Sequence, residues 1–261
     1  MRHNLLTVLS ISAIALASTG HAENLRIGTS ADFPPWESVN EKGEIVGFDR
    51  QIGDEICARI NAECEWVNQG FDGLLPSLAI GRFDLVISGI SITAEREKEV
   101  AFSAAYADAP NSFVTALGSD LAAAETRDDL EAGLEGAVVG VQVGSTHEAV
   151  LVAHFSGATV RTYERPEQIL ADIRVGRIQA GLTERSVWDS LLADDSTGIA
   201  FAGPLLTSTD YSEFGRGQGI VLAQESTELL GRVNVAVEAM LADGTITQFS
   251  NEAFGYDLSA N

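Results

Sequence analysis

The sequence predicts an α/β protein of two lobes, each a mainly parallel sheet flanked by helices. Strand-like and helix-like segments alternate along the chain, which is typical of parallel sheets with right-handed crossovers. A helix, a Gly-Arg pair and a buried strand occur twice, at Gly81-Arg82 and, 95 residues later, at Gly176-Arg177. The last segment fits neither copy, so we expect it to complete the first lobe. The chain then crosses between the lobes twice, near 106–113 and near 200–206, and two crossings form a hinge.

The expected order of parts follows from this pattern. Residues 1–22 form a signal peptide, 23–110 and 204–261 form the first lobe, and 111–203 form the second lobe. In the first lobe we expect strands at 25–29, 64–67 and 83–88 and helices at 47–60 and 71–79. In the second lobe we expect strands at 136–141 and 178–182 and helices at 145–155 and 166–173, and in the tail a strand at 218–222 and two helices ending near Phe254.

The N-terminus has the three parts of a secretory signal. Arg2 precedes an apolar run from Leu5 to Ala17, and small residues lead to Ala22. A first core helix is the alternative. Cleavage near Ala22 predicts a periplasmic protein. The sequence has no second long apolar segment, so we expect no stable membrane insertion.

Cys57 and Cys64 are the only two cysteines, and an oxidising compartment favours a disulfide between them. Seven residues of continuous helix would separate their Cα atoms by about 10 Å, whereas a disulfide allows about 4.4–6.8 Å. The helix must therefore end between them, and Asn61 is a credible left-handed terminator. A redox or metal-binding pair is the alternative.

The composition excludes one class of partner. Sixteen Lys and Arg against 38 Asp and Glu give a formal charge of −22, which would repel a nucleic acid. The acidic residues are dispersed among apolar ones, so a disordered chain is not expected either.

The loops at the strand carboxyl ends carry the selective chemistry, because ligands of open α/β sheets bind there. Arg96 follows Thr93 in a first helical turn, where a cation opposes the helix dipole; it either holds an anion or is a surface residue neutralised by its glutamate neighbours. Ser145 and Glu148 form a capping box whose helix N-terminus could bind a carboxylate or could simply be capped. Glu184 follows a buried strand, where it could meet an ammonium group.

Aromatic residues lie on loops of the first lobe. Phe33, Trp36 and Phe71 could enclose an aliphatic stem or support a cation, although a single aromatic residue more often belongs to the core.

These residues resemble one family. The segment from Gly28 to Ser38, Gly47-Phe48-Asp49, the cysteine pair, Asp84–Thr93 with Arg96, and Val139–Thr146 follow the pattern of solute-binding protein family 3. These are the polar amino-acid binding proteins of ABC transporters, and the chain is similar to the histidine and lysine/arginine/ornithine branch over essentially the whole mature length. The resemblance implies a type II periplasmic binding protein fold, an inner-membrane ABC permease as partner and a monomer, without cofactor, metal or catalytic residue.

The resemblance also implies a role for each cleft residue. Arg96 and Thr146 would bind the ligand α-carboxylate, and Glu184 would bind the α-ammonium with Ser88 and Ser91. Phe33 and Phe71 would stack on the side chain, and Gly89 would contribute backbone only. The full expected ligand-binding set is Ser30, Phe33, Phe71, Ser88, Gly89, Ser91, Arg96, Gln142, Ser145, Thr146 and Glu184, with possible contacts from Asp32, Trp36 and His147.

Several positions depart from that branch. Ser30 replaces an Asp that binds a distal cation, Gln142 replaces a frequent Leu and His147 a frequent Gln. Asp32 is an added acid on the same loop. The ligand is therefore a polar amino acid or derivative, either neutral or cationic.

Two other functions remain open. Periplasmic cyclohexadienyl dehydratases resemble this family, and Glu184 or Glu37 could act as a general acid. No second spaced acid, nucleophile–His pair or zinc-ligand spacing supports that reading. The third hypothesis is a ligand-sensing partner of a membrane receptor.

Overall fold

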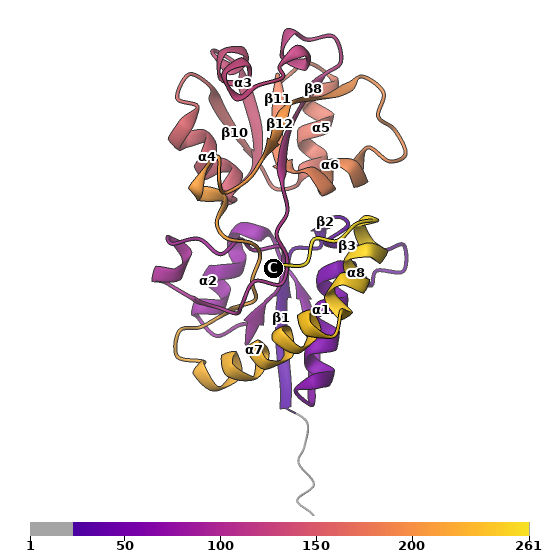
Figure 1. Ribbon diagram of the computed structural model, residues 1–261, viewed down its shortest axis with the longest axis vertical. Helices are drawn as coiled ribbons and strands as arrows, with labels where there is room; N and C mark the ends of the chain where they lie inside the picture. Colours follow the sequence, from indigo (N-terminus) through magenta and orange to yellow (C-terminus); the bar gives the residue numbers. More distant parts are fainter. Residues whose placement is uncertain (1–22, 261) are drawn as a thin grey trace, which may run out of the picture.

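Two lobes stacked along the long axis make up the protein, and two chain segments connect them (Figure 1). The computed structural model describes residues 23–260, so the expected signal peptide at 1–22 lies outside the described residues. Within this range, no helix has the length and apolar character that a membrane crossing needs. The predicted two-lobed α/β architecture is confirmed.

The first lobe contains a five-stranded sheet in the order β5-β1-β6-β13-β7. β1 pairs in parallel with β5 and β6, while β13 pairs antiparallel with β6 and β7. The tail strand β13 thus completes the first lobe, as expected. The strands are β1 (Glu23–Thr29), β5 (Ala62–Asn68), β6 (Leu85–Val86), β7 (Ala101–Phe102) and β13 (Val221–Leu222), and a small sheet consists of β2 (Asp32–Phe33), β3 (Glu37–Val39) and β4 (Ile45–Val46).

Helices of the first lobe come from both parts of the chain. They are α1 (Phe48–Arg59), η1 (Phe71–Gly73), α2 (Leu74–Ala79), η2 (Arg96–Lys98), α7 (Thr227–Ala242) and α8 (Thr245–Phe254). Ile52 and Ile56 of α1 share one buried cluster with Val237 and Met240 of α7. Burial of these side chains is the main force that holds the tail on the first lobe.

The second lobe has the sheet order β10-β9-β11-β8-β12. β9 pairs in parallel with β10 and β11, and β8 pairs antiparallel with β11 and β12. Its elements are β8 (Asn111–Ala116), η3 (Asp120–Ala123), α3 (Arg127–Leu134), β9 (Val138–Gln142), α4 (Thr146–His154), β10 (Thr159–Tyr163), α5 (Pro166–Arg174), β11 (Ala180–Glu184), α6 (Arg185–Leu191), β12 (Ile199–Leu206) and η4 (Ser212–Phe214).

The two Gly-Arg pairs end their helices in the same way. Gly81 and Gly176 have φ of 71° and 72°, the left-handed conformation that glycine adopts without strain. The amide of Arg82 donates to the carbonyl of Ser77 at 3.0 Å, and that of Arg177 donates to the carbonyl of Asp172 at 2.9 Å. Both are helix-terminating motifs of the Schellman type. The two Gly-Arg pairs that the sequence placed at corresponding points therefore share one backbone geometry.

The chain crosses between the lobes at two adjacent segments. Ala107 and Gln218 lie side by side, and the Gln218 amide donates to the Ala107 carbonyl at 2.7 Å. Tyr211 and Phe214 belong to a buried cluster of the second lobe, so the return crossing follows them. It lies beyond the expected crossing at 200–206 and the expected boundary at 204, because these two aromatic side chains pack on Phe155 and α4 rather than on the first lobe.

The disulfide has the predicted position. Cys57 and Cys64 are bonded with their Cα atoms 6.2 Å apart, α1 ends at Arg59, and Asn61 has φ of 55°. The bridge joins the last turn of α1 to β5.

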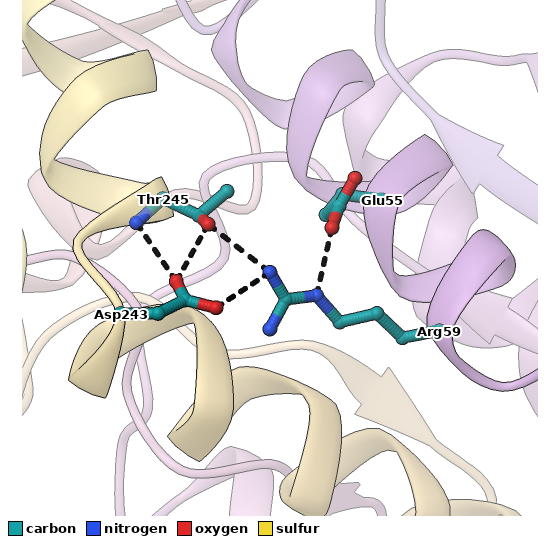
Figure 2. Close-up of polar contacts among 4 residues, drawn as sticks. All are labelled: Glu55, Arg59, Asp243 and Thr245. Carbon is teal, nitrogen blue, oxygen red and sulfur yellow. Dashed lines mark hydrogen bonds and ion pairs between the residues drawn. The ribbon is translucent and has the colours of Figure 1, made fainter.

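An ion-pair network holds the same helix end to the tail (Figure 2). Arg59 Nε donates to Glu55 at 2.7 Å, and Nη2 contacts Asp243 Oδ2 at 2.9 Å and Thr245 Oγ1 at 3.0 Å. Asp243 also accepts from the amide and hydroxyl of Thr245, which begins α8. The end of α1 is thereby tied to the junction of α7 and α8.

Candidate functional site

A narrow enclosed cavity lies between the lobes, and its free volume in this arrangement is about 10 Å³, roughly the space of one water molecule. Residues of both lobes line it: Phe33, Phe71, Ser88, Gly89, Ser91 and Arg96 from the first, and Gln142, Ser145, Thr146, His147 and Glu184 from the second. All eleven were singled out in the sequence. Several come from the carboxyl ends of β6, β9 and β11, where the topology brings their loops together.

Arg96 contacts both lobes through its guanidinium. Nη1 donates to the Ser91 carbonyl at 3.0 Å, and Nη2 donates across the cleft to the Gly144 carbonyl at 3.1 Å. The guanidinium carbon lies 5.8 Å from the centre of the Phe71 ring. Burial lowers the pKa of Arg96 to about 10, while the nearby Glu184 opposes this shift. Arg96 is therefore cationic at neutral pH, and a guanidinium has five N–H groups, so it can still pair with a carboxylate.

The N-terminus of α4 faces Arg96 across the cavity. Ser145 Oγ accepts from the Glu148 amide at 3.3 Å, as a cap should, and donates to the Gln142 carbonyl at 2.7 Å. The carboxylate of Glu148 accepts from the Gly144 amide at 2.8 Å, one residue before the expected partner. Only half of the predicted capping box is thus formed. The first-turn amides of Thr146 and His147 remain available to an anion, as at other helix N-termini.

Glu184 is a buried acid on the opposite wall. Burial, and next the negative charge of Asp49, raise the pKa of Glu184 to about 8, against smaller contributions from Gln218 and Arg96. Its Oε2 is buried and has no hydrogen-bond partner among residues 23–260. Ionised Glu184 would be stabilised by a cation inside the cavity.

A carboxyl network supports the wall formed by Ser88 and Gly89. The Ser88 hydroxyl donates to Glu37 Oε1 at 2.7 Å and accepts from the Ser30 amide at 3.0 Å. Ser88 Oγ is left with one lone pair, which suits it to accept from an ammonium group. Burial, with the charge of Asp49, raises the pKa of Glu37.

Asp49 continues this network. Its two oxygens accept from the Gly89 amide at 2.6 Å and from the Tyr106 hydroxyl at 2.8 Å, and burial raises its pKa to about 6. Sequence reasoning noticed Asp49 only as part of a motif and missed Tyr106 and Gln218. An acid in the first turn of a helix with an apolar buried face was the available signal for Asp49.

His147 is neutral and oriented. Its Nε2 lies 2.8 Å from Asn111 Oδ1, and Asn111 Nδ2 donates to the Leu206 carbonyl at 3.3 Å. The amide of Asn111 therefore presents its oxygen, so Nε2 carries the imidazole proton. Burial, and then the charge of Arg96, lower the pKa of His147 to about 3.

Three expected residues do not line the enclosed cavity. The hydroxyl of Ser30 donates to Asp32 Oδ1 at 3.2 Å. Asp32 lines a wider chamber of about 700 Å³ at the mouth of the cleft, with Phe71, Asp72, Glu164, Arg165 and Glu167 among its walls. Burial raises the pKa of Asp32 to about 6. Trp36 is fully buried in the core of the first lobe.

Metal ligation finds no support in the described part of the chain, because residues 23–260 contain no group of three or more His, Cys, Asp or Glu side chains placed to hold an ion.

The fold is that of the type II periplasmic binding proteins, with its cavity between two lobes. The model of the bacterial extracellular solute-binding proteins, family 3, matches residues 25–256, and the chain belongs to this family. It is 33% identical to an L-arginine-binding protein of Pseudomonas aeruginosa over 97% of this chain and 96% of that one. It is also 33% identical to the histidine-binding periplasmic protein of Escherichia coli K12, over 98% of this chain and 96% of that one.

Solved structures agree with this assignment. A Salmonella typhimurium periplasmic binding protein described as having high arginine specificity matches with a TM-score of 0.80 at 30% identity, covering 89% of this chain and all of the other. An ancestral arginine-binding protein bound to glutamine matches with a TM-score of 0.79 at 31% identity, covering 90% and 99% of the two chains. The chain is thus a solute-binding protein.

Proposed function

We propose that the protein is the extracytoplasmic substrate-binding component of an ABC importer and binds a polar amino acid or amino-acid derivative. One observation carries the proposal: Arg96 on one lobe and Glu184 on the other line the same enclosed cavity. A zwitterion supplies both counter-charges at once. Without it, each buried group is poorly compensated, because burial disfavours the charged form of both.

Each end of the zwitterion has a defined set of partners. The α-carboxylate pairs with the Arg96 guanidinium and with the Thr146 amide and hydroxyl at the start of α4. The α-ammonium pairs with Glu184 and donates to the hydroxyls of Ser88 and Ser91. Phe33 and Phe71 cover the side chain, and Gln142 and His147 add polar groups to the second wall.

The side chain of the ligand is the less constrained part. Relatives include proteins named for binding arginine, histidine and lysine/arginine/ornithine. Here Ser30 offers no charge, and the acid nearest to that position is Asp32, at the mouth of the cleft. The protein therefore takes polar amino acids, and a cationic side chain is favoured only if it reaches the outer chamber.

Binding is coupled to lobe closure, because the ligand contacts both walls and so stabilises the closed arrangement. The protein acts as a periplasmic monomer and delivers its ligand to an inner-membrane permease. It is not an enzyme in this proposal.

A thermal-shift screen tests the proposal. The probes are the twenty amino acids, ectoine, opines and betaines, each at 1 mM or more. A ligand at 100 times its dissociation constant adds about 2.7 kcal/mol to the free energy of unfolding, which is easily detected. Agmatine, which lacks the α-carboxylate of arginine, and amino-acid amides serve as matched controls and should give no shift. Equal shifts from acids and their amides would contradict the proposal.

A second candidate is a dehydratase of the cyclohexadienyl type. The observation in its favour is that Glu184, with a pKa of about 8, is protonated at neutral pH and could donate to a leaving hydroxyl. Incubation with prephenate and arogenate, followed by absorbance of the aromatic product, tests it. Turnover that disappears in Glu184→Gln would favour the enzyme over the transporter component.

A further inference from the structure

A buried hydrogen bond joins the two lobes outside the cavity. The indole Nε1 of Trp36, in the first lobe, donates to the hydroxyl of Ser186, on α6 of the second lobe, at 3.1 Å. The relative exposure of Trp36 is 0% and that of Ser186 is 4%. Neither side chain lines the enclosed cavity.

The indole is held by its own lobe. The Trp36 ring makes edge contacts with Phe48 and Phe254, with centroid distances of 5.6 and 5.1 Å, and the Trp36 carbonyl accepts from the Asp49 amide at 2.8 Å. Its N–H group donates to the second lobe. A phenylalanine would fill much of the same core volume but could not donate this bond.

The second lobe approaches this point closely. Val187, which follows Ser186, is fully buried and packs in the core cluster of the first lobe. The start of α6 is therefore seated on the first lobe in this closed arrangement. When the lobes separate, Ser186 leaves the indole and Val187 leaves its apolar surroundings.

The bond lies behind both walls of the cavity. The Trp36 ring is 3.7 Å from where a Cβ on Gly89 would lie, and Gly89 is a lining residue. Ser186 follows the lining residue Glu184 by two positions. The contact thus joins the backbone that carries one wall to the helix start that carries the other.

We propose that Trp36 and Ser186 are a positioning pair that stabilises the closed lobes whether or not ligand is present. The inference rests on the proposed function, in which the lobes close on a ligand. Because apparent affinity scales with the population of the competent state, the pair sets affinity for all ligands and leaves selectivity among them unchanged. One buried hydrogen bond changes the open–closed equilibrium roughly two- to twelvefold.

The test compares Ser186→Ala with Ser190→Ala, a matched control one turn further along α6. Small-angle scattering of the ligand-free proteins should give a larger radius of gyration for Ser186→Ala and no change for Ser190→Ala. This readout needs no ligand, so it can fail or succeed independently of the proposed function. An unchanged radius of gyration for Ser186→Ala would overturn the pair's role in closure.

Calorimetry on two or more ligands from the screen provides the second readout. Ser186→Ala should raise the dissociation constant of every ligand by the same factor, within the two- to twelvefold range. Trp36→Phe should have the same effect. The double variant should be no weaker than either single one, because both remove the same bond. A change in the ratio of affinities between ligands would instead make the pair a selectivity determinant and refute the proposal.

Discussion

Arg96 in the first lobe donates a hydrogen bond to the carbonyl oxygen of Gly144 in the second, with Nη2 and the oxygen 3.1 Å apart. Gly144 immediately precedes the cap of α4, whose first amides face the cavity. The same guanidinium therefore lines the ligand cavity and touches the opposite lobe. A carboxylate bound between Arg96 and α4 would add an ion pair to a bridge that now joins the Arg96 cation to a neutral carbonyl.

Replacement of Arg96 by lysine should abolish high-affinity binding. Lysine keeps the charge but loses the planar pair of donors that a carboxylate and the Gly144 carbonyl need. We expect a loss of at least about 100-fold in affinity, equivalent to about 2.7 kcal/mol, measured by calorimetry.

Arg216→Lys is the matched control for this substitution, because Arg216 is exposed and pairs with Glu97 outside the cavity. It should bind as the unaltered protein does. If Arg96→Lys kept its affinity within threefold, the carboxylate would have to bind elsewhere.

Ligand binding should release protons at pH 7. Glu184, with a pKa of about 8, is largely protonated in the empty cavity, and an ammonium beside it lowers that pKa. The pKa of His147, about 3, lies too far below neutral for His147 to take up the proton. Binding enthalpies measured in phosphate and in Tris should therefore differ in proportion to the ionisation enthalpies of these buffers.

Glu184→Gln, which cannot ionise, should bind more weakly and show a smaller buffer dependence. Identical enthalpies in both buffers for the unaltered protein would mean that Glu184 is already ionised before the ligand arrives.

The sequence predicted the lining of the cavity well because strand carboxyl ends are constrained by topology. Ser88 and Thr146 follow strands, and Glu184 is the last residue of one. The apolar runs of these strands can be recognised in the sequence, so the three residues meet once the two lobes are arranged face to face. The helix ends at Gly81 and Gly176 could also be predicted, because glycine adopts the left-handed backbone conformation at a helix end without strain.

Side-chain direction within loops was less predictable. Trp36 was named as a possible ligand contact or a core residue, and the short antiparallel pairing of β2 with β3 turns it into the core, where it contacts Phe48. The hydroxyl of Ser30 donates to Asp32, a local hydrogen bond that a periodic sequence pattern does not predict. The segment 207–214 stays with the second lobe because Tyr211 and Phe214 find apolar partners there, and its polar sequence hides that preference.

Asp32→Asn should separate cationic from neutral ligands. Asp32 faces the outer chamber, so its charge acts on a side chain that extends past Phe71. We expect affinity for arginine or lysine, if either is bound, to fall by about 10-fold and affinity for a neutral ligand to change by less than twofold, given about 1–2 kcal/mol for a partly buried charge pair.

Asp128→Asn removes the same charge from an exposed position on α3 and should change neither affinity. If Asp32→Asn lost the same factor in affinity for neutral and for cationic ligands, Asp32 would support the loop and would not interact with the charge of the ligand side chain.

The ligand-free protein should lose stability as the pH rises from 6.5 to 8. In the folded chain Glu184 has a pKa of about 8, raised from its ordinary 4.5, so in this window the folded state holds a proton that the unfolded state has released. The stability gained from that proton is fully present only below the unfolded pKa of 4.5, falls by at most about 1.4 kcal/mol per pH unit as the pH rises from there, and is gone once the pH has passed the folded pKa of about 8. Glu37, whose pKa is also raised, acts in the same direction.

The other buried groups interfere little in this window. His147, with a folded pKa of about 3, is neutral in both states above pH 6.5, and Asp32 and Asp49, with folded pKa values of about 6, are mostly ionised there. Denaturant unfolding at pH 6.5, 7.25 and 8 should thus show a falling free energy of unfolding, and Glu184→Gln should flatten it. A saturating ligand should also reduce the slope, because its ammonium replaces the proton on Glu184. A free energy that rises over this range would show that the cavity already compensates the ionised carboxylate.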